Sequence, residues 1–282
     1  MTTASVTPSR SPAVQYVLRL ADLCLIHAQR LGEWSGHAPI LEEDIALTNL
    51  SLDLIGQSRA LLTHAGQLGA ADTGGVALDE DQLAFLRDER EYRNPTLVEL
   101  PHNADGRHHG ERDFATTTLR NALVATWLRL VWERLAESSD AELAAIAAKA
   151  LKEARYHQQH SADWVVRLGD GTDESARRMQ RAVDHLWRYL PELFEDDEVD
   201  AHAAATGLGP SASSLKAAFD AEVAELMAEA RLTLPAASPY RSTGRRGVHS
   251  EHMGYILAEM QDRKSTRLNS SHSQQSRMPS SA

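Results

Sequence analysis

The stretch DAELAAIAAKALKEARYHQQHSADWVVRL, residues 140–168, decides the fold class of this chain. Small and apolar residues recur in it every three or four positions, which is the spacing of one face of an α-helix. The predicted inner face runs through these positions: Ala147, Ala150, Ala154, His157, Ser161 and Trp164. This face turns His157 toward a core and leaves Glu153 and His160 at its edge. The sequence therefore predicts a long helix whose buried side carries polar groups.

The same helical spacing fills most other long segments, whereas alternating, strand-like runs are scarce. The chain of 282 residues is therefore predicted to be all-α. Helices are expected over these ranges: 13–31, 39–68, 113–138, 140–168, a fifth beginning at Thr172, 213–232, and a last short helix before Gln261. Residues 69–112 contain Gly-Gly and Asn-Pro and should form a long connection with a short helix over 79–90. Long connections of this kind occur in bundles whose helices are not all antiparallel neighbours.

Three regions follow from the composition along the chain. Residues 1–12 are predicted to be a flexible N-terminus, and residues 13–262 to form the helical domain. Residues 263–282 are Ser-rich, nearly devoid of aliphatic side chains and aperiodic, so disorder is expected there. This tail begins abruptly after the apolar pattern YILAEMQ, and we interpret it as an artefact of a frameshift or read-through.

Charge and cysteine content exclude several classes of protein. The net charge of −11 argues against binding to nucleic acid or to an anionic membrane surface. The N-terminus lacks an apolar signal-peptide core, and no apolar run approaches membrane-spanning length. The single cysteine, Cys24, has no partner for an internal disulfide and is interpreted as a small core residue. A cytoplasmic protein is expected.

A di-metal carboxylate site in a helical bundle would need one carboxylate on each of two helices and Glu-x-x-His on each of the other two. On the first helix, Asp22 interrupts an apolar run. On the second, Asn49, Asp53 and Gln57 form a polar stripe, but the position three residues after Asp53 is Gly56. The required histidine is therefore missing from the second helix.

The other two helices are also incomplete. The third carries no carboxylate from Phe114 to Trp132, and on the fourth the histidine follows Glu153 by four residues instead of three. Two acid-x-x-His matches, Glu99 with His102 and Asp105 with His108, fall in the Pro- and Gly-containing connection, where no helix would align them. We interpret these two matches as chance.

Each polar group has a competing structural interpretation. For Glu153, His157 and His160, a buried hydrogen-bonded cluster is favoured over a metal site. A network between helices that sets their register is favoured for these residues: Asp22, Asn49, Asp53 and Gln57. The basic residues Arg241, Arg245 and Arg246 suit phosphate binding or a partner contact, and salt bridges or an interhelical surface are favoured over phosphate.

Several long motifs resemble one protein family. They are RLGEWSGHAP with ALTNLSLDLIGQSRALL, LRDEREYRNPTLVELP, KEARYH with RLGDGTDES, and GRRGVHSEHMGYILAEMQ. In this order, from Tyr16 to Gln261, they are similar to the structural, C-type subunits of bacterial phenylacetyl-CoA epoxidase, also called phenylacetate-CoA oxygenase. The chain departs from the family pattern after Gln261.

The resemblance implies a ferritin-like helical bundle with extra C-terminal helices and no cofactor in this chain. It implies a catalytic partner subunit that holds a di-iron centre and binds the CoA thioester, a further small subunit, and a reductase with NADPH, FAD and a 2Fe–2S cluster. The complex would insert one oxygen atom of O2 into the aromatic ring to give the 1,2-epoxide. The resemblance also implies that this subunit is a degenerate sister of the catalytic one and is required for assembly.

The resulting hypothesis is a non-catalytic structural subunit in a hetero-oligomer of phenylacetate catabolism. Its degenerate metal-site candidates are Asp22, Asp53, Glu153 and His157. The alternative is an autonomous di-metal carboxylate enzyme that uses these four residues, with His160 as a further candidate ligand. A stand-alone helical binding module, without iron or partner, is a third interpretation.

Overall fold

The computed structural model describes residues 5–106 and 110–261. The tail over 263–282 and His108 lie outside these residues, so the expectation of an artefactual tail stays a prediction. In the described part of the chain the only β pairing is an isolated antiparallel bridge between Thr243 and Val248. The predicted all-α class is therefore confirmed. No helix in this part is long and apolar enough to cross a membrane.

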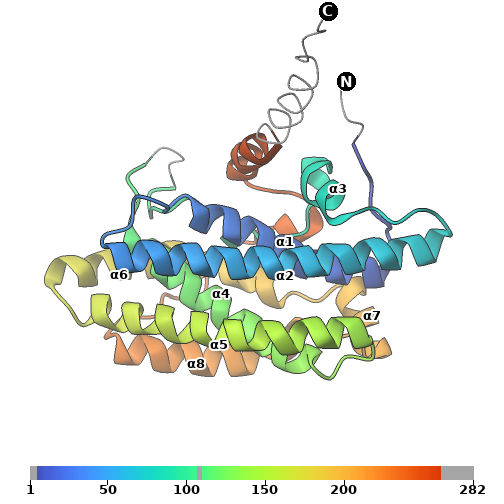
Figure 1. The fold of residues 1–282 in the computed structure, drawn as a ribbon. Coiled ribbons are helices and arrows are strands. Elements are labelled where there is room, and N and C mark those ends of the chain that lie inside the picture. The colour runs from blue at the N-terminus through green and yellow to red at the C-terminus, as the bar shows by residue number, and fades with distance from the viewer. Residues whose placement is uncertain (1–4, 107–109, 262–282) are drawn as a thin grey trace, which may run out of the picture.

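Two long helical hairpins form the centre of the fold. The helices of the bundle are α1 (Pro12–Gly32), α2 (Leu41–Thr73), α4 (Phe114–Leu135) and α5 (Ala141–Gly169). α1 packs most extensively against α2, and α4 against α5. Figure 1 shows α2 and α5 lengthwise across the front of the bundle, α4 behind them and α8 below α5. This arrangement agrees with the predicted ferritin-like bundle.

Shorter elements surround the bundle. They are α3 (Glu80–Phe85), α6 (Asp173–Leu186), α7 (Glu198–Thr206), α8 (Lys216–Glu229), a helix over 251–261, and 3-10 turns at Glu89–Glu91, Thr96–Val98, Trp187–Phe194, Ser213–Leu215 and Gly244–Arg246. α6 and α8 pack on α4 and α5, while α7 packs on α1. The shorter helices thus cover the sides of α1 and α4 that α2 and α5 leave open.

Local capping explains where the long helices begin. Ser11 accepts a hydrogen bond from the backbone N–H of Val14, and Pro12 occupies the first turn of α1. Asp140 accepts from the N–H of Leu143 at the start of α5. Such caps satisfy backbone donors that have no partner within the helix. The starts predicted from these residues agree with the structure to within one residue.

Both ends of α2 differ from the prediction of a helix over 39–68. α2 begins at Leu41, two residues after Pro39, and continues past Gly69 to Thr73. It ends at Gly74, whose φ of 66° is the left-handed conformation that favours glycine at a helix C-terminus. A single internal glycine weakens a helix by only about 1 kcal/mol, and packing of this long helix outweighs that cost.

The short helix expected over 79–90 is also divided. α3 spans only Glu80–Phe85, and a 3-10 turn at Glu89–Glu91 follows a break at Arg87. Arg87 bends into the core, where it donates hydrogen bonds to the carbonyl oxygens of Leu83 and Glu91. α7 was not predicted, although Asp197 caps it and Gly207 ends it.

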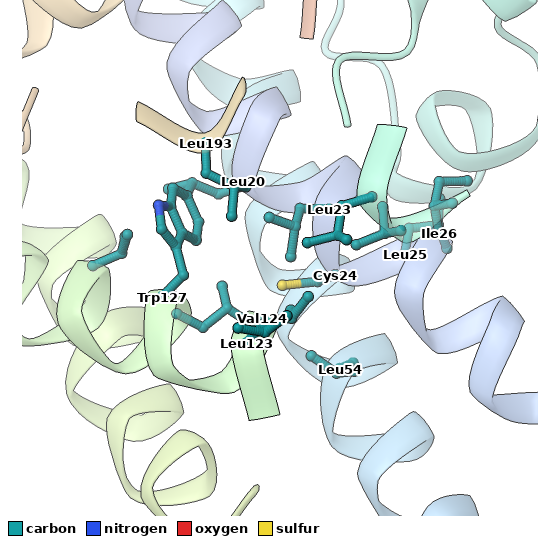
Figure 2. Packing of buried hydrophobic residues seen from close by; sticks show 14 of the residues in the cluster. Leu20, Leu23, Cys24, Leu25, Ile26, Leu54, Leu123, Val124, Trp127 and Leu193 are labelled. Atoms are coloured by element: carbon teal, nitrogen blue, oxygen red, sulfur yellow. The ribbon is translucent and has the colours of Figure 1, made fainter. Parts of the chain in front are cut away.

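Burial divides the four bundle helices into two kinds. Nearly every residue of α1 and α4 is buried, including their polar side chains, whereas α2 and α5 each keep an exposed face. Figure 2 shows the centre, where Leu20, Leu23, Leu123 and Trp127 pack with their neighbours. The two inner helices are thus enclosed on all sides, and α2 and α5 form the outer layer.

Candidate functional site

The polar side chains of α5 meet α2 along one seam. Pairs across this seam include Glu43–His160, Asp53–His157, Gln57–Glu153 and His64–Asp140. His157 Nε2 lies 3.0 Å from Asp53 Oδ2, and Gln57 Nε2 donates to Glu153 Oε2 at 2.9 Å. Glu153, His157 and His160 are therefore in the hydrogen-bonded arrangement favoured from the sequence, and each has its partner on α2.

Asp22 lies apart from this seam. Its carboxylate accepts a hydrogen bond from Arg87 Nη1 at 2.9 Å and another from the backbone N–H of Arg93 at 2.8 Å. The side chains of Asp22 and Arg87 are both completely buried. Asn49 is exposed on the outer face of α2. The expectation of one network was therefore wrong, because Asp22 and Asn49 point in directions away from Asp53 and Gln57.

An apolar cluster lies where α1, α2 and α4 meet. Figure 2 shows Cys24 of α1 surrounded by Leu54 of α2 and by Leu123 and Val124 of α4. All four side chains are buried. Burial raises the pKa of the Cys24 thiol, and its Sγ lies 3.6 Å from the side-chain oxygen of Gln57. The thiol therefore stays protonated and behaves as a small core group.

The inner positions of α5 are those predicted, whereas the inner positions of α2 differ from the ones assigned by counting residues. On α5 the buried pair three residues apart is Ala154 and His157, while Tyr156 is exposed. On α2 Gln57 is buried and Gly56 is exposed. A histidine at position 56 would therefore point outward. We expected Gly56 to occupy the inner position where a metal-binding histidine would lie. This expectation was wrong, because the inner position is Gln57.

A di-metal carboxylate centre does not fit the side chains that face this centre. Such a centre draws carboxylates from all four helices and histidines from two of them. The inner face of α5 offers His157 with Ala154 in place of an acid, and α1 and α2 offer Cys24 and Gln57. In residues 5–106 and 110–261, no group of three or more His, Cys, Asp or Glu is arranged to hold a metal ion.

Two buried histidines of this region, His27 and His157, are neutral. Burial lowers the pKa of His27 well below its ordinary value, and the charge of Arg120 lowers it further. Burial also lowers the pKa of His157, against the opposing effect of Asp53. His27 Nδ1 has no hydrogen-bond partner among the described residues. A neutral imidazole carries the smaller desolvation cost, so these groups act as polar core residues.

A second buried network, absent from the sequence-based expectations, joins α1, the connection and α4. His102 Nδ1 lies 2.7 Å from Thr117 Oγ1 and 2.8 Å from Arg120 Nη2, and its Nε2 lies 2.5 Å from the carbonyl oxygen of Arg30. A neutral imidazole with its proton on Nε2 satisfies all three contacts. Burial lowers the pKa of Arg120 to about 9, and the charge of Arg30 adds to this shift.

His102 and Glu99, which form one of the acid-x-x-His matches, do not point toward a common metal site. Their hydrogen-bond partners are different. Glu99 instead accepts hydrogen bonds from Asn94 and from His249 and Ser250 near the C-terminus. The Glu99 and His249 side chains are completely buried. Burial opposes the charged form of His249, but the hydrogen bond and charge of Glu99 outweigh it and raise the pKa. This pair ties residues 249–261 to the connection.

The basic loop is held mainly by carboxylates of the same chain. Arg245 Nη2 lies 3.0 Å from Asp200 Oδ1, and its backbone N–H donates to the buried Glu192. Arg241 and Arg246 are more exposed and lie 3.5 Å and 3.4 Å from Glu195. This is the salt-bridged arrangement favoured from the sequence, and Arg245 has no free face for a phosphate.

Comparison with known proteins gives two findings. The family described as phenylacetic acid catabolic protein matches residues 1–271. The chain is also 47% identical over 246 residues to the C-type subunit of 1,2-phenylacetyl-CoA epoxidase from Escherichia coli (strain K12). That alignment covers 87% of this chain and 93% of the E. coli protein. Both findings agree with the resemblance that the sequence motifs indicate.

Proposed function

This chain belongs to the family of phenylacetic acid catabolic proteins, and we propose that it is the non-catalytic structural subunit of a 1,2-phenylacetyl-CoA epoxidase. The observation that carries the proposal is the interior of the bundle, where Cys24, Leu54, Leu123 and Val124 pack between α1, α2 and α4 and the carboxylates do not converge. A chain with this centre contributes to the epoxidase through its surface, and the oxidation takes place in a partner.

The complex that we propose has a defined composition. A catalytic subunit supplies the di-iron centre and the site for phenylacetyl-CoA, a further small subunit belongs to the oxygenase, and a reductase with FAD and a 2Fe–2S cluster delivers electrons from NADPH. Because the proposed substrate is a CoA thioester, we propose a cytoplasmic location for the complex. In this proposal the present chain holds the catalytic subunit in its active shape.

The structure gives reasons to regard this chain as a rigid scaffold. Buried ion pairs such as Asp22–Arg87 and Glu99–His249 join the bundle to the connection and to the C-terminal segment. Removing one member of a buried pair leaves an uncompensated charge, so such pairs oppose local rearrangement. Stable partner interfaces of obligate complexes often bury more than about 2,000 Å2, and a rigid helical surface suits that area.

The alternative of an autonomous di-metal enzyme loses support from the positions of its proposed ligands. Asp22 is paired with Arg87, and Asp53 and Glu153 are bonded to His157 and Gln57 along the seam between α2 and α5. These carboxylates do not converge on a common point with His157. We therefore do not favour the alternative.

Co-expression with the catalytic subunit encoded in the same organism tests the proposal. We expect the two chains to co-purify, and the reconstituted oxygenase with its reductase to epoxidise phenylacetyl-CoA only when this chain is present. The iron content of the chain purified alone is measured in parallel. A catalytic subunit that is fully active without this chain, or two tightly bound irons in the lone chain, would contradict the proposal.

A further inference from the structure

The outer face of α2 carries an apolar stripe that is open in the described part of the chain. Four large apolar side chains on it are exposed to these fractions: Leu41 71%, Ile45 54%, Leu52 59% and Ile55 38%. Their spacings of four, seven and three residues place them on one side of the helix, over a length of about 21 Å. Figure 1 shows α2 unobstructed along the front of the bundle. A contiguous apolar patch of this kind marks an interaction site.

The charges of this face are separated along the helix. In the first turn of α2 Glu42 is exposed and Asp44 is half-buried, and Arg59 is exposed farther along. Between Asp44 and Arg59 the only ionisable residue of α2 is Asp53, which contacts His157 on the side toward α5. The apolar stripe therefore has carboxylates at one end and a guanidinium at the other.

Arg59 is paired within the chain but keeps donors for a partner. Its Nε donates to Glu80 Oε1 at 3.0 Å, and its side chain is 74% exposed. A guanidinium has five N–H donors, so this bond leaves Arg59 able to bind a further carboxylate. The other two acids in the first turn of α3 are engaged within the chain, because Asp79 caps α3 and Asp81 has its own partner.

The two ends of the stripe match each other when a second α2 runs antiparallel. Leu41 and Arg59 are eighteen residues apart, which is five full turns, so both side chains leave the helix in the same direction. In an antiparallel pair centred at the level of Leu50, Arg59 of each copy is level with Leu41 of the other. Glu42 and Asp44 leave the helix on either side of Leu41, so the guanidinium reaches two carboxylates.

The apolar part of the stripe matches in the same register. Ile45 of each copy is level with Ile55 of the other, and Leu52 is level with the half-buried Thr48. Interface centres are depleted in charged residues, and the face between the two ends has this composition. One register therefore satisfies the apolar centre and both charged ends, with no residue outside α2 required.

We propose that the outer face of α2 is the contact between two copies of this chain, related by a twofold axis at the level of Leu50. A twofold axis places the same patch on both sides of an interface, and this face is complementary to itself. The apolar side chains supply the affinity, while Arg59 and the carboxylates set direction and register. A parallel pair would bring the first-turn acids of both copies together. This inference does not rest on the proposed function.

Sedimentation of the lone chain tests the contact. We expect the wild type to show an equilibrium of monomer and dimer between about 1 and 200 μM. Leu52→Glu should raise the dissociation constant at least about 30-fold, because each dimer then buries two new carboxylates near its axis. Leu234→Glu is the matched control, since Leu234 is 41% exposed in the segment after α8. A wild type that stays monomeric, or one dissociation constant for all three proteins, would overturn the proposal.

Crosslinking tests the direction of the two helices. Ile45→Cys and Ile55→Cys chains are mixed and treated with a short bismaleimide, and the completely buried Cys24 supplies no competing thiol. In the antiparallel pair the reagent should join one variant to the other, and neither variant efficiently to itself. Self-crosslinking of Ile45→Cys and of Ile55→Cys, without the mixed product, would mean a parallel pair and would overturn the proposal.

Charge exchange tests the register. Arg59→Glu places a new carboxylate level with the first-turn acids of the other copy and should raise the dissociation constant at least about 10-fold. Adding Glu42→Arg to it should restore most of the lost affinity. Arg177→Glu, which makes the same charge change in an exposed pair on α6, should have no effect. Equal dissociation constants for Arg59→Glu and Arg177→Glu would overturn the proposal.

Two other occupants of the face give different results. If the lone wild type is a monomer and Leu52→Glu abolishes binding to the catalytic subunit, the face belongs to that subunit and the proposal is overturned. If Leu52→Glu lowers the melting temperature by more than about 4 °C at a concentration where the wild type is monomeric, residues of the same chain cover the face, and the proposal is again overturned.

Discussion

His157 of α5 lies 3.0 Å from Asp53 of α2, and this contact joins the two hairpins across the polar seam of the bundle. His157 is 3% exposed, whereas the side chain of Asp53 is 39% exposed. Burial lowers the pKa of His157 in spite of the nearby carboxylate. The contact is therefore a hydrogen bond from a neutral imidazole to a carboxylate at neutral pH. In acid, protonation of His157 would place a charge on a buried imidazole.

Stability should fall when the pH is lowered from 7 to 5.5. The pKa values of His27, His102 and His157 are all lowered, chiefly by burial. A folded-state pKa below the unfolded value of about 6.5 means that the unfolded chain binds more protons in this range, so the free energy of unfolding decreases with acid. Each histidine contributes up to about 1.4 kcal/mol per pH unit.

Urea unfolding at several pH values measures this slope. His27→Leu removes one of the three groups whose pKa values are lowered, so the dependence of the free energy of unfolding on pH should become less steep by at most the contribution of one proton. His249 opposes the effect above about pH 6.5, because its raised pKa makes its stabilisation grow as the pH falls toward the unfolded value, and it adds no further change below that value. A slope that stays the same in His27→Leu would contradict the neutral state of His27.

Breaking the buried pair Asp22–Arg87 should be costly, and removing both members should cost less than the two single changes together. Asp22→Leu leaves the Arg87 guanidinium buried without a carboxylate, which costs about 3–5 kcal/mol. In Asp22→Leu with Arg87→Met no charge remains unpaired. Denaturant unfolding of both single variants and the double variant gives the coupling energy. Lys216→Ala, which breaks an exposed pair on α8, should cost no more than about 1 kcal/mol. Additive costs at Asp22 and Arg87 would contradict the pairing.

Glu99→Gln should release the C-terminal segment from the bundle in a pH-dependent way. In the wild type the pKa of His249 is raised by Glu99, so this stabilisation is present below pH 6.5 and is lost as the pH rises through the folded value. Hydrogen exchange of residues 249–261 should therefore speed up with pH, beyond its intrinsic pH dependence, in the wild type. In Glu99→Gln exchange should be fast at pH 6 already. Equal protection of this segment in both proteins at pH 6 would show that other contacts hold it.

Helical periodicity predicted most of the bundle, because long amphipathic faces and caps such as Asp140 and Thr172 act locally. The inner face predicted for α5 is buried from Ala147 to Ser161 as expected. The end of α2 and the existence of α7 could not be predicted in the same way. Gly69 signals a stop that packing overrides, and α7 is short and has no clear apolar periodicity of its own.

The polar groups were harder to assign than the helices. Counting residues showed that His157 faces inward, but it assigned Gly56 to the inner face of α2 although it lies on the outer face. A polar side chain near the middle of a bundle helix can face either of the two adjacent helices. Which helix supplies its hydrogen-bond partner depends on how the helices pack. Asp22 pairs with Arg87, and Glu99 pairs with His249. In each pair the two residues are distant in sequence, and at least one lies in a non-helical segment, where helical periodicity makes no prediction.

Two glycines of α2 should respond in opposite ways to alanine. At Gly56 a Cβ would meet nothing within 4 Å, so Gly56→Ala only restricts the unfolded chain and should raise stability by about 0.5–1 kcal/mol. At Gly66 a Cβ would lie 1.9 Å from the backbone carbonyl oxygen of Leu78. Gly66→Ala must therefore displace the segment that leads into α3 and should lower stability by about 1–3 kcal/mol. The two variants are matched, because each adds one methyl group to the same helix, and thermal unfolding compares them directly. Stabilisation by both would mean that the segment around Leu78 does not pack against α2.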